Sequence, residues 1–312
     1  MTAGSRAAGA GEGRATAEER AEALAAEPLL VVAAQRGFVT GGAESLRQVW
    51  RYRELLGLLV RREIKVRYKD SALGLLWTLI RPLAMLAVYY FAIGKFLGAQ
   101  RAIPDFAVYI FTGLTAYQLF SEIVSGCTGS ILGNAGLVKK IYLPREVFPL
   151  STVGSALFNF GVQLTVLVAA TIAVGKVPWG ERLLYLPLSV AVLFVWALAL
   201  GLLLAAINVY LRDVQYLVEI SLVVLFWTTP TVYSLGLVRD AVGPTIEAIY
   251  LANPLAAAVL GMQRVFWVAG DGTVQADGLG VRLLIMLAIG TVLLCLAQRV
   301  FSRLEGNFAQ EL

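Results

Sequence analysis

The chain has 312 residues, of which 58% are hydrophobic and only 15% are charged, and its mean hydropathy is +0.74. Soluble domains carry about 25% charged residues, and a chain of this length cannot bury so much apolar surface, so a soluble enzyme, a disordered protein and a collagen-like fibre are excluded. The absence of histidine also excludes Ser-His-Asp catalysis and histidine-bound metals, and the composition predicts an integral membrane protein.

The first 44 residues are rich in Ala, Gly, Glu and Arg and contain few large apolar side chains. Their one apolar run, residues 28–34, is too short for the core of a signal peptide with its usual flanks. We expect residues 1–44 to form a mobile cytoplasmic tail, and the first membrane span to act as its own insertion signal.

Residues 45–70 are predicted to form an amphipathic helix, because apolar side chains recur every four positions from Tyr52 to Tyr68. Between residues 51 and 69 there are seven basic and two acidic side chains, which accounts for the whole net charge of +5. We expect this helix to lie on the cytoplasmic face of the bilayer, where anionic headgroups attract each basic side chain by roughly 1 kcal/mol. A basic helix of a soluble domain is the alternative. The basic residues nearest the first span, called here the basic cluster, are Arg61, Arg62, Lys65, Arg67 and Lys69.

Six segments have the roughly 20 apolar residues that a membrane-crossing helix needs. They are residues 73–97, 106–132, 152–174, 183–207, 217–237 and 281–300. Residues 238–279 hold only shorter apolar pieces around Asn253, Pro254 and Gly261, which indicates re-entrant helices with Arg264 at their wet rim. The predicted fold class is all-α: a polytopic membrane protein with six transmembrane helices, an N-terminal amphipathic interfacial helix, and re-entrant helices between spans five and six.

The distribution of Lys and Arg predicts the orientation of these spans. With the N-terminus inside, thirteen basic residues of the short connections fall in the cytoplasm and seven fall outside. Six spans return the chain to the side on which it began. We therefore expect both termini to be cytoplasmic and residues 238–279 to be external.

The connection between the second and third spans, residues 134–151, mixes charges with seven large apolar side chains and two prolines. A loop that is only solvated does not need so many apolar groups. A short helix ending before Pro144, with apolar side chains among charged ones, fits a groove on a cytoplasmic partner. An interfacial loop anchored among lipid headgroups is the alternative.

Two ionisable residues are expected inside spans. Arg81 lies about 12 Å and Glu122 about 16 Å from the cytoplasmic ends of the first and second spans, at the rise of an α-helix. A charge at such depth costs several kcal/mol unless it is paired or faces water. We expect Arg81 and Glu122 to pair with each other or to line a wet conduit; snorkelling of Arg81 to the nearer interface is the alternative.

Four separated segments of the chain carry a family resemblance. They are LLVRREIKVRYKDSALGLLWTLIRPL at 58–83, LVKKIYLPREVFPLS at 137–151, NVYLRDVQY at 208–216 and FSRLEGNFAQEL at 301–312. Together they closely resemble the type-2 ABC exporter permeases, and among these the polysaccharide and teichoic-acid branch (Wzm- and TagG-like proteins). The resemblance covers residues 45–312 in order, and only the first 44 residues lie outside it.

The resemblance implies a homodimer that binds two copies of a separate ABC ATPase, which holds ATP and Mg²⁺, while this chain binds no cofactor. The sequence agrees, because it contains no G-x-x-x-x-G-K-[ST] phosphate loop. Glycans of this branch travel on an undecaprenyl-type diphosphate lipid, so the basic cluster is a candidate to bind the diphosphate, although headgroup anchoring explains the same charges. The residues implied to couple this chain to the ATPase are Lys139, Lys140, Ile141, Tyr142, Leu143, Pro144, Arg145 and Glu146.

These features predict the membrane permease of an ATP-driven exporter in the bacterial inner membrane, which moves a lipid-linked cell-envelope polysaccharide or teichoic-acid-like polymer outward. The alternatives are a permease of the same type for drugs or small lipids and, with less support, a membrane-embedded glycosyltransferase or a scaffold without transport. We expect no catalysis by this chain and no nucleic-acid partner. Cys127 and Cys295 form no CxxC motif, so no metal site is predicted.

Overall fold

The structure, a computed structural model, describes residues 47, 49–68, 74–140, 143–274 and 276–312, and every regular element in these ranges is a helix. The predicted all-α fold class is therefore confirmed. The predicted tail, residues 1–44, lies outside the described residues.

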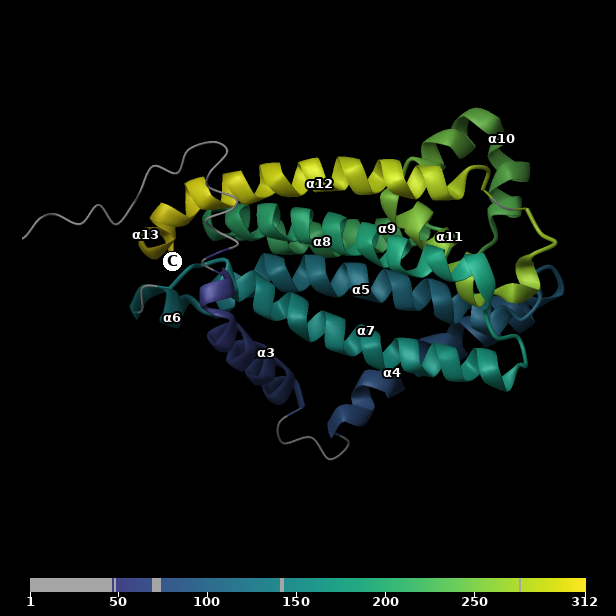
Figure 1. The fold of residues 1–312 in the computed structure, drawn as a ribbon, viewed down its shortest axis with the longest axis horizontal. Helices are drawn as coiled ribbons and strands as arrows, with labels where there is room; N and C mark the ends of the chain where they lie inside the picture. Colours follow the sequence, from purple (N-terminus) through teal and green to yellow (C-terminus); the bar gives the residue numbers. More distant parts are fainter. Residues whose placement is uncertain (1–46, 48, 69–73, 141–142, 275) are drawn as a thin grey trace, which may run out of the picture. The chain divides into compact units, whose positions relative to one another are not determined.

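Four long helices run beside one another and form the centre of the fold (Figure 1). They are α5 (Phe106–Gly133), α7 (Val147–Ala173), α8 (Tyr185–Tyr210) and α12 (Leu279–Leu304). Each has 26 to 28 residues, more than the roughly 20 that cross a bilayer. Helix α5 packs against both α7 and α8, and α8 packs against α12.

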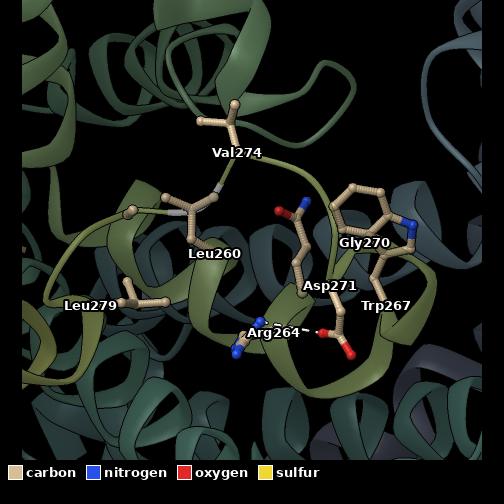
Figure 2. A pocket seen from close by; sticks show the side chains of 9 residues that line it. Leu260, Arg264, Trp267, Gly270, Asp271, Val274 and Leu279 are labelled. Atoms are coloured by element: carbon tan, nitrogen blue, oxygen red, sulfur yellow. Dashed lines mark hydrogen bonds and ion pairs between the residues drawn. The ribbon is translucent and has the colours of Figure 1, made fainter.

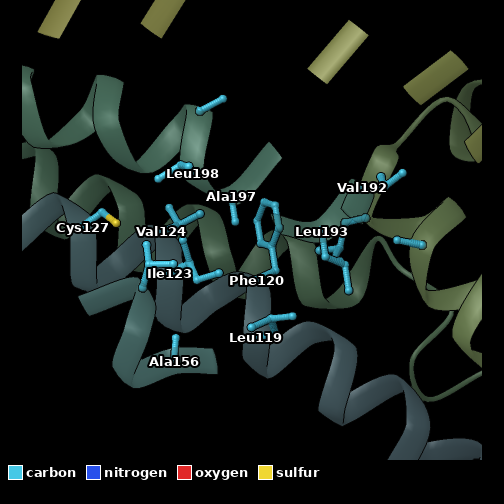
Figure 3. Packing of buried hydrophobic residues seen from close by; sticks show 14 of the residues in the cluster. Leu119, Phe120, Ile123, Val124, Cys127, Ala156, Val192, Leu193, Ala197 and Leu198 are labelled. Atoms are coloured by element: carbon cyan, nitrogen blue, oxygen red, sulfur yellow. The ribbon is translucent and has the colours of Figure 1, made fainter. Parts of the chain in front are cut away.

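The interface between α5 and α8 is closely packed, because small side chains lie among large ones. Figure 3 shows Phe120 and Val124 of α5 beside Ala197 and Leu198 of α8. Ala197 is fully buried, as is Cys127 one turn along α5 from Val124. Without a hydrophobic driving force between helices in lipid, such close packing is what holds a membrane bundle together.

Helix α3 (Arg53–Tyr68) falls within the predicted interfacial helix, residues 45–70, and packs against α7. Its apolar side turns inward, with Leu59 buried, while its basic side chains are exposed. The two helices approach most closely where Val60 lies over Gly154: a Cβ atom at position 154 would come within 2.5 Å of Val60 Cγ2. Any residue other than glycine at position 154 would therefore push α3 outward.

The first predicted span, residues 73–97, is a helix of changing pitch. It begins as η1 (Gly74–Leu76), continues as α4 (Trp77–Tyr89) and widens into a π-helix, η2 (Tyr90–Phe96). Large apolar side chains such as Val88 and Phe91 are exposed along it, a surface that suits lipid or a second chain. The 3₁₀ turn η3 (Ala99–Arg101) leads from it towards α5.

The structure differs from the prediction at the fifth span, residues 217–237, which is not one helix. Helix α9 (Val214–Trp227) ends after 14 residues, and α10 (Leu235–Leu251) begins only after a non-helical stretch. Pro230 explains the break, because proline lacks an N–H and disfavours helical backbone in the residue before it. A helix of 14 residues is shorter than the bilayer core.

The part of the chain after this break lies within the predicted re-entrant region, residues 238–279. The last turns of α10 and helix α11 (Pro254–Phe266) meet at an angle of 82°. Among the described residues, five helices are long and apolar enough to cross a membrane, or six if this bent pair counts as one span. The number of six spans therefore stays a prediction.

Side chains from distant elements satisfy the non-helical backbone at residues 228–234. The Tyr109 hydroxyl lies 3.0 Å from the Pro230 carbonyl oxygen and 2.6 Å from that of Tyr233. Gln263 Nε2 donates a second hydrogen bond to the Pro230 carbonyl, at 2.7 Å. Irregular backbone at membrane depth needs such partners, because each unsatisfied group costs several kcal/mol.

The connection between the second and third predicted spans, residues 134–151, is shorter than predicted. It holds the short helix α6 (Ala135–Lys140), which ends before Pro144 as predicted, but residues 147–151 already belong to α7. Pro149 does not prevent this, because it lies in the first turn of α7, where no intrahelical partner is needed for its nitrogen. The remaining elements are η4 (Gly180–Leu184), η5 (Val268–Gly270), η6 (Glu305–Asn307) and α13 (Phe308–Glu311).

Candidate functional site

The residues predicted to couple this chain to an ATPase, 139–146, follow directly on residues 134–138, and the whole segment 134–146 is called here the elbow. Lys139 and Lys140 at the end of α6 are exposed, whereas Leu143, Pro144 and Arg145 are half-buried. Ile141 and Tyr142 lie outside the described residues. The exposed end of the elbow offers two adjacent positive charges to a partner.

Glu146, at the other end of the elbow, is directed into the protein. It is only 4% exposed, and its Oε1 accepts hydrogen bonds from Gln298 Nε2 at 2.6 Å and from Ser302 Oγ at 3.4 Å. The Glu146 side chain thus points away from the surface that Lys139 and Lys140 present, and its predicted place in the ATPase-coupling region stays a prediction. Glu146 fixes the elbow to α12.

The C-terminal residues support the elbow at a second point. The Arg145 guanidinium lies over the Phe308 ring, 6.0 Å from its centroid. Phe308 is fully buried and packs edge-on against Phe301 and Tyr210, at centroid distances of 5.5 and 6.2 Å. This contact could not be predicted from the sequence, because residues 145 and 308 are far apart in the chain and no local pattern links them.

The basic cluster lies on α3 beside the start of the elbow. Arg61, Arg62, Lys65 and Arg67 are exposed, and Lys69 lies outside the described residues. Arg62 Nη1 donates a hydrogen bond of 3.1 Å to Asn134 Oδ1, and Asn134 is the residue at which α5 ends and α6 begins. This hydrogen bond ties α3 to the first residue of the elbow.

Glu122 has a different partner from the predicted one. Arg67 Nη1 lies 3.1 Å from Glu122 Oε1, and Asn159 Nδ2 lies 3.1 Å from both carboxylate oxygens. Arg81, the predicted partner, is exposed on α4, and no ion pair of Arg81 is found in the described ranges. The predicted pair Arg81–Glu122 is therefore wrong, because the last turn of α3 reaches Glu122 and α4 presents Arg81 outward.

The sequence contained one signal for this cluster. Asn159 is a strongly polar residue in the middle of the apolar helix α7, and it is only 4% exposed. A buried amide in a membrane helix needs a partner. That the partner is Glu122, on a different helix, follows only from the packing of α5 against α7.

The predicted external residues lie around the bend between α10 and α11. Asn253 caps α11, since its Oδ1 accepts the N–H of Leu255 at 3.0 Å, and Pro254 is the first residue of the helix. Figure 2 shows Arg264 directed towards Asp271, and the two side chains form an ion pair of 3.2 Å. Arg182 pairs with the same carboxylate at 2.5 Å. These contacts close the loop after α11 onto the start of α8.

A second ion pair stabilises the kink of α10 at Gly243, where φ is +73°. Arg239 Nε and Nη2 both bond Glu247 Oε1, at 3.0 and 2.8 Å. The hydrogen bond to Glu247 raises the pKa of Arg239 above its ordinary value, so that guanidinium stays charged. The pair bridges the kink and holds its two arms together.

Metal-binding residues do not gather in the part of the chain that the structure describes, where no group of three or more His, Cys, Asp or Glu side chains could hold an ion. Cys127 is buried between α5 and its neighbours, and Cys295 is exposed on α12.

Comparison with known proteins gives one family and a consistent set of relatives. Residues 54–267 match the model of the ABC-2 type transporter family. The chain is 31% identical to an O-antigen export system permease protein, RfbA, of Myxococcus xanthus, over 86% of this chain and 98% of that protein. It is 27% identical to the RfbA protein of Klebsiella pneumoniae, over 82% and 94% of the two chains, and 26% identical to the polysialic acid transport protein KpsM of Escherichia coli, over 57% and 69%.

Proposed function

This chain belongs to the ABC-2 type transporter family, and on that premise we propose that it is the membrane permease of an exporter of cell-envelope polysaccharide. The relatives export O-antigen, polysialic acid or capsular polysaccharide according to their names. The permease role agrees with a chain of long apolar helices. The chain is a transport subunit, and the chemistry of ATP hydrolysis belongs to a separate partner.

The elbow is the observation that carries the proposal. Its exposed end presents Lys139 and Lys140, and its buried end is bonded through Glu146 to α12. An element that is exposed at one end and fixed to the bundle at the other can transmit a push from a partner to the helices. We propose that two copies of an ABC ATPase, which hold ATP and Mg²⁺, bind a homodimer of this chain at its two elbows.

The proposed substrate is a lipid-linked glycan, and the proposed orientation has both termini and the elbow in the cytoplasm. Supporting this orientation, the exposed charges of α3 and α6 lie at the same end of the bundle, joined by the Arg62–Asn134 hydrogen bond. The basic cluster then lies at the inner membrane surface, where it can bind the diphosphate of a lipid carrier. Among the described residues of the cluster, Arg61 and Lys65 have neither an ion pair nor a side-chain hydrogen bond in the described ranges.

Reconstitution tests the proposal. The chain and a candidate ABC ATPase from the same organism would be placed together in vesicles with a lipid-linked glycan, and ATP-dependent arrival of the glycan in the trans compartment would be measured. We expect transport only with both subunits present, and no ATP hydrolysis by this chain alone. Transport of drugs or short lipids without any transport of glycan would support the alternative permease, and sugar transfer without transport would support a glycosyltransferase.

A matched pair of variants tests the role of the elbow. The double variant K139A/K140A should lose at least tenfold in affinity for the ATPase, because it removes both exposed charges of α6. The control R101A removes an exposed charge at the end of η3, before the start of α5 and far from α6 along that helix, and should leave affinity unchanged. Equal loss in both variants would show that the ATPase does not dock at the elbow.

A further inference from the structure

Helix α5 is buried on all sides except for one narrow edge, and in the half nearer α6 that edge is polar. The partly exposed residues of this half include Tyr117, Gly126, Gly129 and Leu132. The other partly exposed residues carry polar side chains, Gln118, Ser121, Glu122 and Ser125, which recur at intervals of three and four. This is the spacing of one face of a helix. We call these four residues, with Gln215 and Glu219 of α9, the polar edge.

Helix α9, which packs beside α5, extends this edge. Gln215 Nε2 lies 3.4 Å from Ser125 Oγ and 3.4 Å from Glu219 Oε1, so one amide joins the two helices. Glu219 is itself exposed, one helical turn after Gln215. Six polar side chains therefore form one continuous surface.

Lipid does not suit this surface. A carboxylate in hydrocarbon costs several kcal/mol, and such side chains in membrane helices face protein or water. The exposed face of α12 shows the contrast, because its exposed side chains Val281, Ile285 and Val292 are apolar. The polar edge therefore faces either a water-filled passage or another protein surface.

An aromatic cluster marks the end of the polar edge. Tyr117, one residue before Gln118, packs edge-on against Phe226 at 4.9 Å between ring centroids, and Phe226 also contacts Tyr89 of α4 at 5.7 Å. Tyr89 of α4 and Phe226 of α9 thus meet beside Tyr117 of α5. The polar edge ends at these three aromatic rings.

The two carboxylates of the polar edge differ in their charge balance. Glu122 is neutralised by Arg67, at 3.1 Å. Glu219 accepts the Gln215 amide, and no cation lies within ion-pair distance of it in the described part of the chain. The surface thus offers hydroxyl and amide hydrogen bonds together with one uncompensated negative charge.

Resting on the proposed function, we propose that the polar edge is the inner wall of the glycan passage, and that Glu219 selects uncharged glycans over acidic ones. Hydroxyl-rich sugars can replace their hydrogen bonds to water by hydrogen bonds to Gln and Ser side chains, without a net cost in free energy. A chain with a carboxylate or phosphate on each repeat is repelled by Glu219 as every repeat passes. The carried polymer is then a neutral polysaccharide rather than a teichoic-acid-like chain.

Thiol labelling of the assembled exporter tests the wall. In a background with Cys127→Ala and Cys295→Ser, the single variants S121C and S125C should react with small water-soluble methanethiosulfonates at least ten times faster than S130C. Ser130 is the matched control, because it lies on the same helix and is only 4% exposed. Rates as slow as that of S130C at both positions would show that a second protein surface covers the edge, and would overturn the proposal.

Charge selection has its own readout. In the S125C variant, the labelling rate of a cationic reagent divided by that of an anionic reagent should fall about fivefold when Glu219→Gln is added. A change of this size is expected when one unit charge a few ångströms away in water is lost. An unchanged ratio would overturn the role of Glu219. A free thiol in solution gives the reference ratio for the two reagents.

Transport competition completes the test. Vesicles loaded with equal amounts of an uncharged lipid-linked glycan and of one with a carboxylate on each repeat should export the uncharged one first, and E219Q should shift the export ratio about fivefold towards the acidic one. Preference of the native protein for the acidic glycan would overturn the proposal. If the native protein exports neither glycan, the proposed function fails, whereas the thiol rates still decide whether the edge faces water.

Discussion

At the scale of single residues, Glu122 shows how a carboxylate is accommodated inside a membrane bundle. Its two oxygens receive one guanidinium and one amide, from helices that precede and follow α5 in the chain. The Glu122 side chain is 20% exposed and that of Arg67 43%, so water screens the pair in part. The contact therefore positions α3 more than it stabilises the fold.

Exchange of the two charges tests this contact. We expect R67E and E122R each to lower glycan export, and the double variant R67E/E122R to recover it, with a coupling of about 1 kcal/mol, or fivefold in rate. Asn159 permits the exchange, because its amide can turn its oxygen towards the new guanidinium.

The control for this exchange uses another arginine of the same helix. Arg61 is exposed on α3 and has no ion pair in the described ranges, so R61E should not rescue E122R. Rescue by R81E instead would restore the pair predicted from the sequence and contradict the contact with Arg67.

At the scale of elements, the position of α3 depends on the absence of one side chain. Gly154 lets α3 lie against α7, and a Cβ atom at this position would meet Val60 at 2.5 Å. A second contact, from Arg62 to Asn134, ties α3 to the elbow. An amphipathic helix held in this way follows the bundle when the bundle moves.

The substitution G154A should displace α3 and destabilise its docking by about 1–3 kcal/mol, as overpacking does. G161A is the matched control, because a Cβ atom at that position of the same helix meets nothing within 4 Å. Proteolysis at the arginines of α3 measures the docking, and we expect faster cleavage only in G154A. Equal cleavage in the two variants would mean that the close approach is unimportant.

The break between α9 and α10 is a second element whose stability depends on a few hydrogen bonds. Y109F removes the hydroxyl that reaches the carbonyls of Pro230 and Tyr233, and we expect a loss of about 1–2 kcal/mol in thermal or denaturant stability. Tyr216 is 68% exposed, so Y216F should change nothing. A Y109F protein as stable as the native one would show that water or another group satisfies these carbonyls.

At the scale of the whole molecule, the elbow is held by parts of the chain more than 150 residues away. Gln298 and Ser302 of α12 bind Glu146, and Phe308 lies under Arg145. The C-terminal residues thus support the elbow, although they lie beyond the residues that match the family model. Glu146 joins the end of the elbow to α12.

Truncation of Phe308 tests this support. F308A removes a fully buried ring and should cost about 3 kcal/mol locally. We expect the variant to bind the ATPase but to lose most of its glycan-stimulated ATP hydrolysis, because the elbow is no longer held. F96A, which truncates a ring that is 83% exposed, is the control, and an equal effect in both would contradict a specific role.

Much of the architecture could be predicted from residue patterns. Uninterrupted apolar segments predicted the helices α5, α7, α8 and α12 to within a few residues, because a membrane span requires both length and low charge. The break after α9 was not predicted, because residues 217–237 are predominantly apolar and Pro230 was not interpreted as a helix breaker. For the candidate site, the coupling role stays a prediction: Lys139 and Lys140 are exposed, whereas the inward direction of the Glu146 side chain was not predicted.

The sequence by itself determined that this chain lives in a membrane, that it is all-α, and which segments carry charge next to apolar spans. Those properties depend on composition and on periodicity within one segment. Only the tertiary structure decided that Glu122 binds Arg67 rather than Arg81, that Glu146 faces inward, and that α5 has one polar edge. The physical reason is that ion pairing and side-chain exposure depend on how helices pack against one another. Helix packing brings together residues that are far apart in the chain, and no local sequence pattern records which ones.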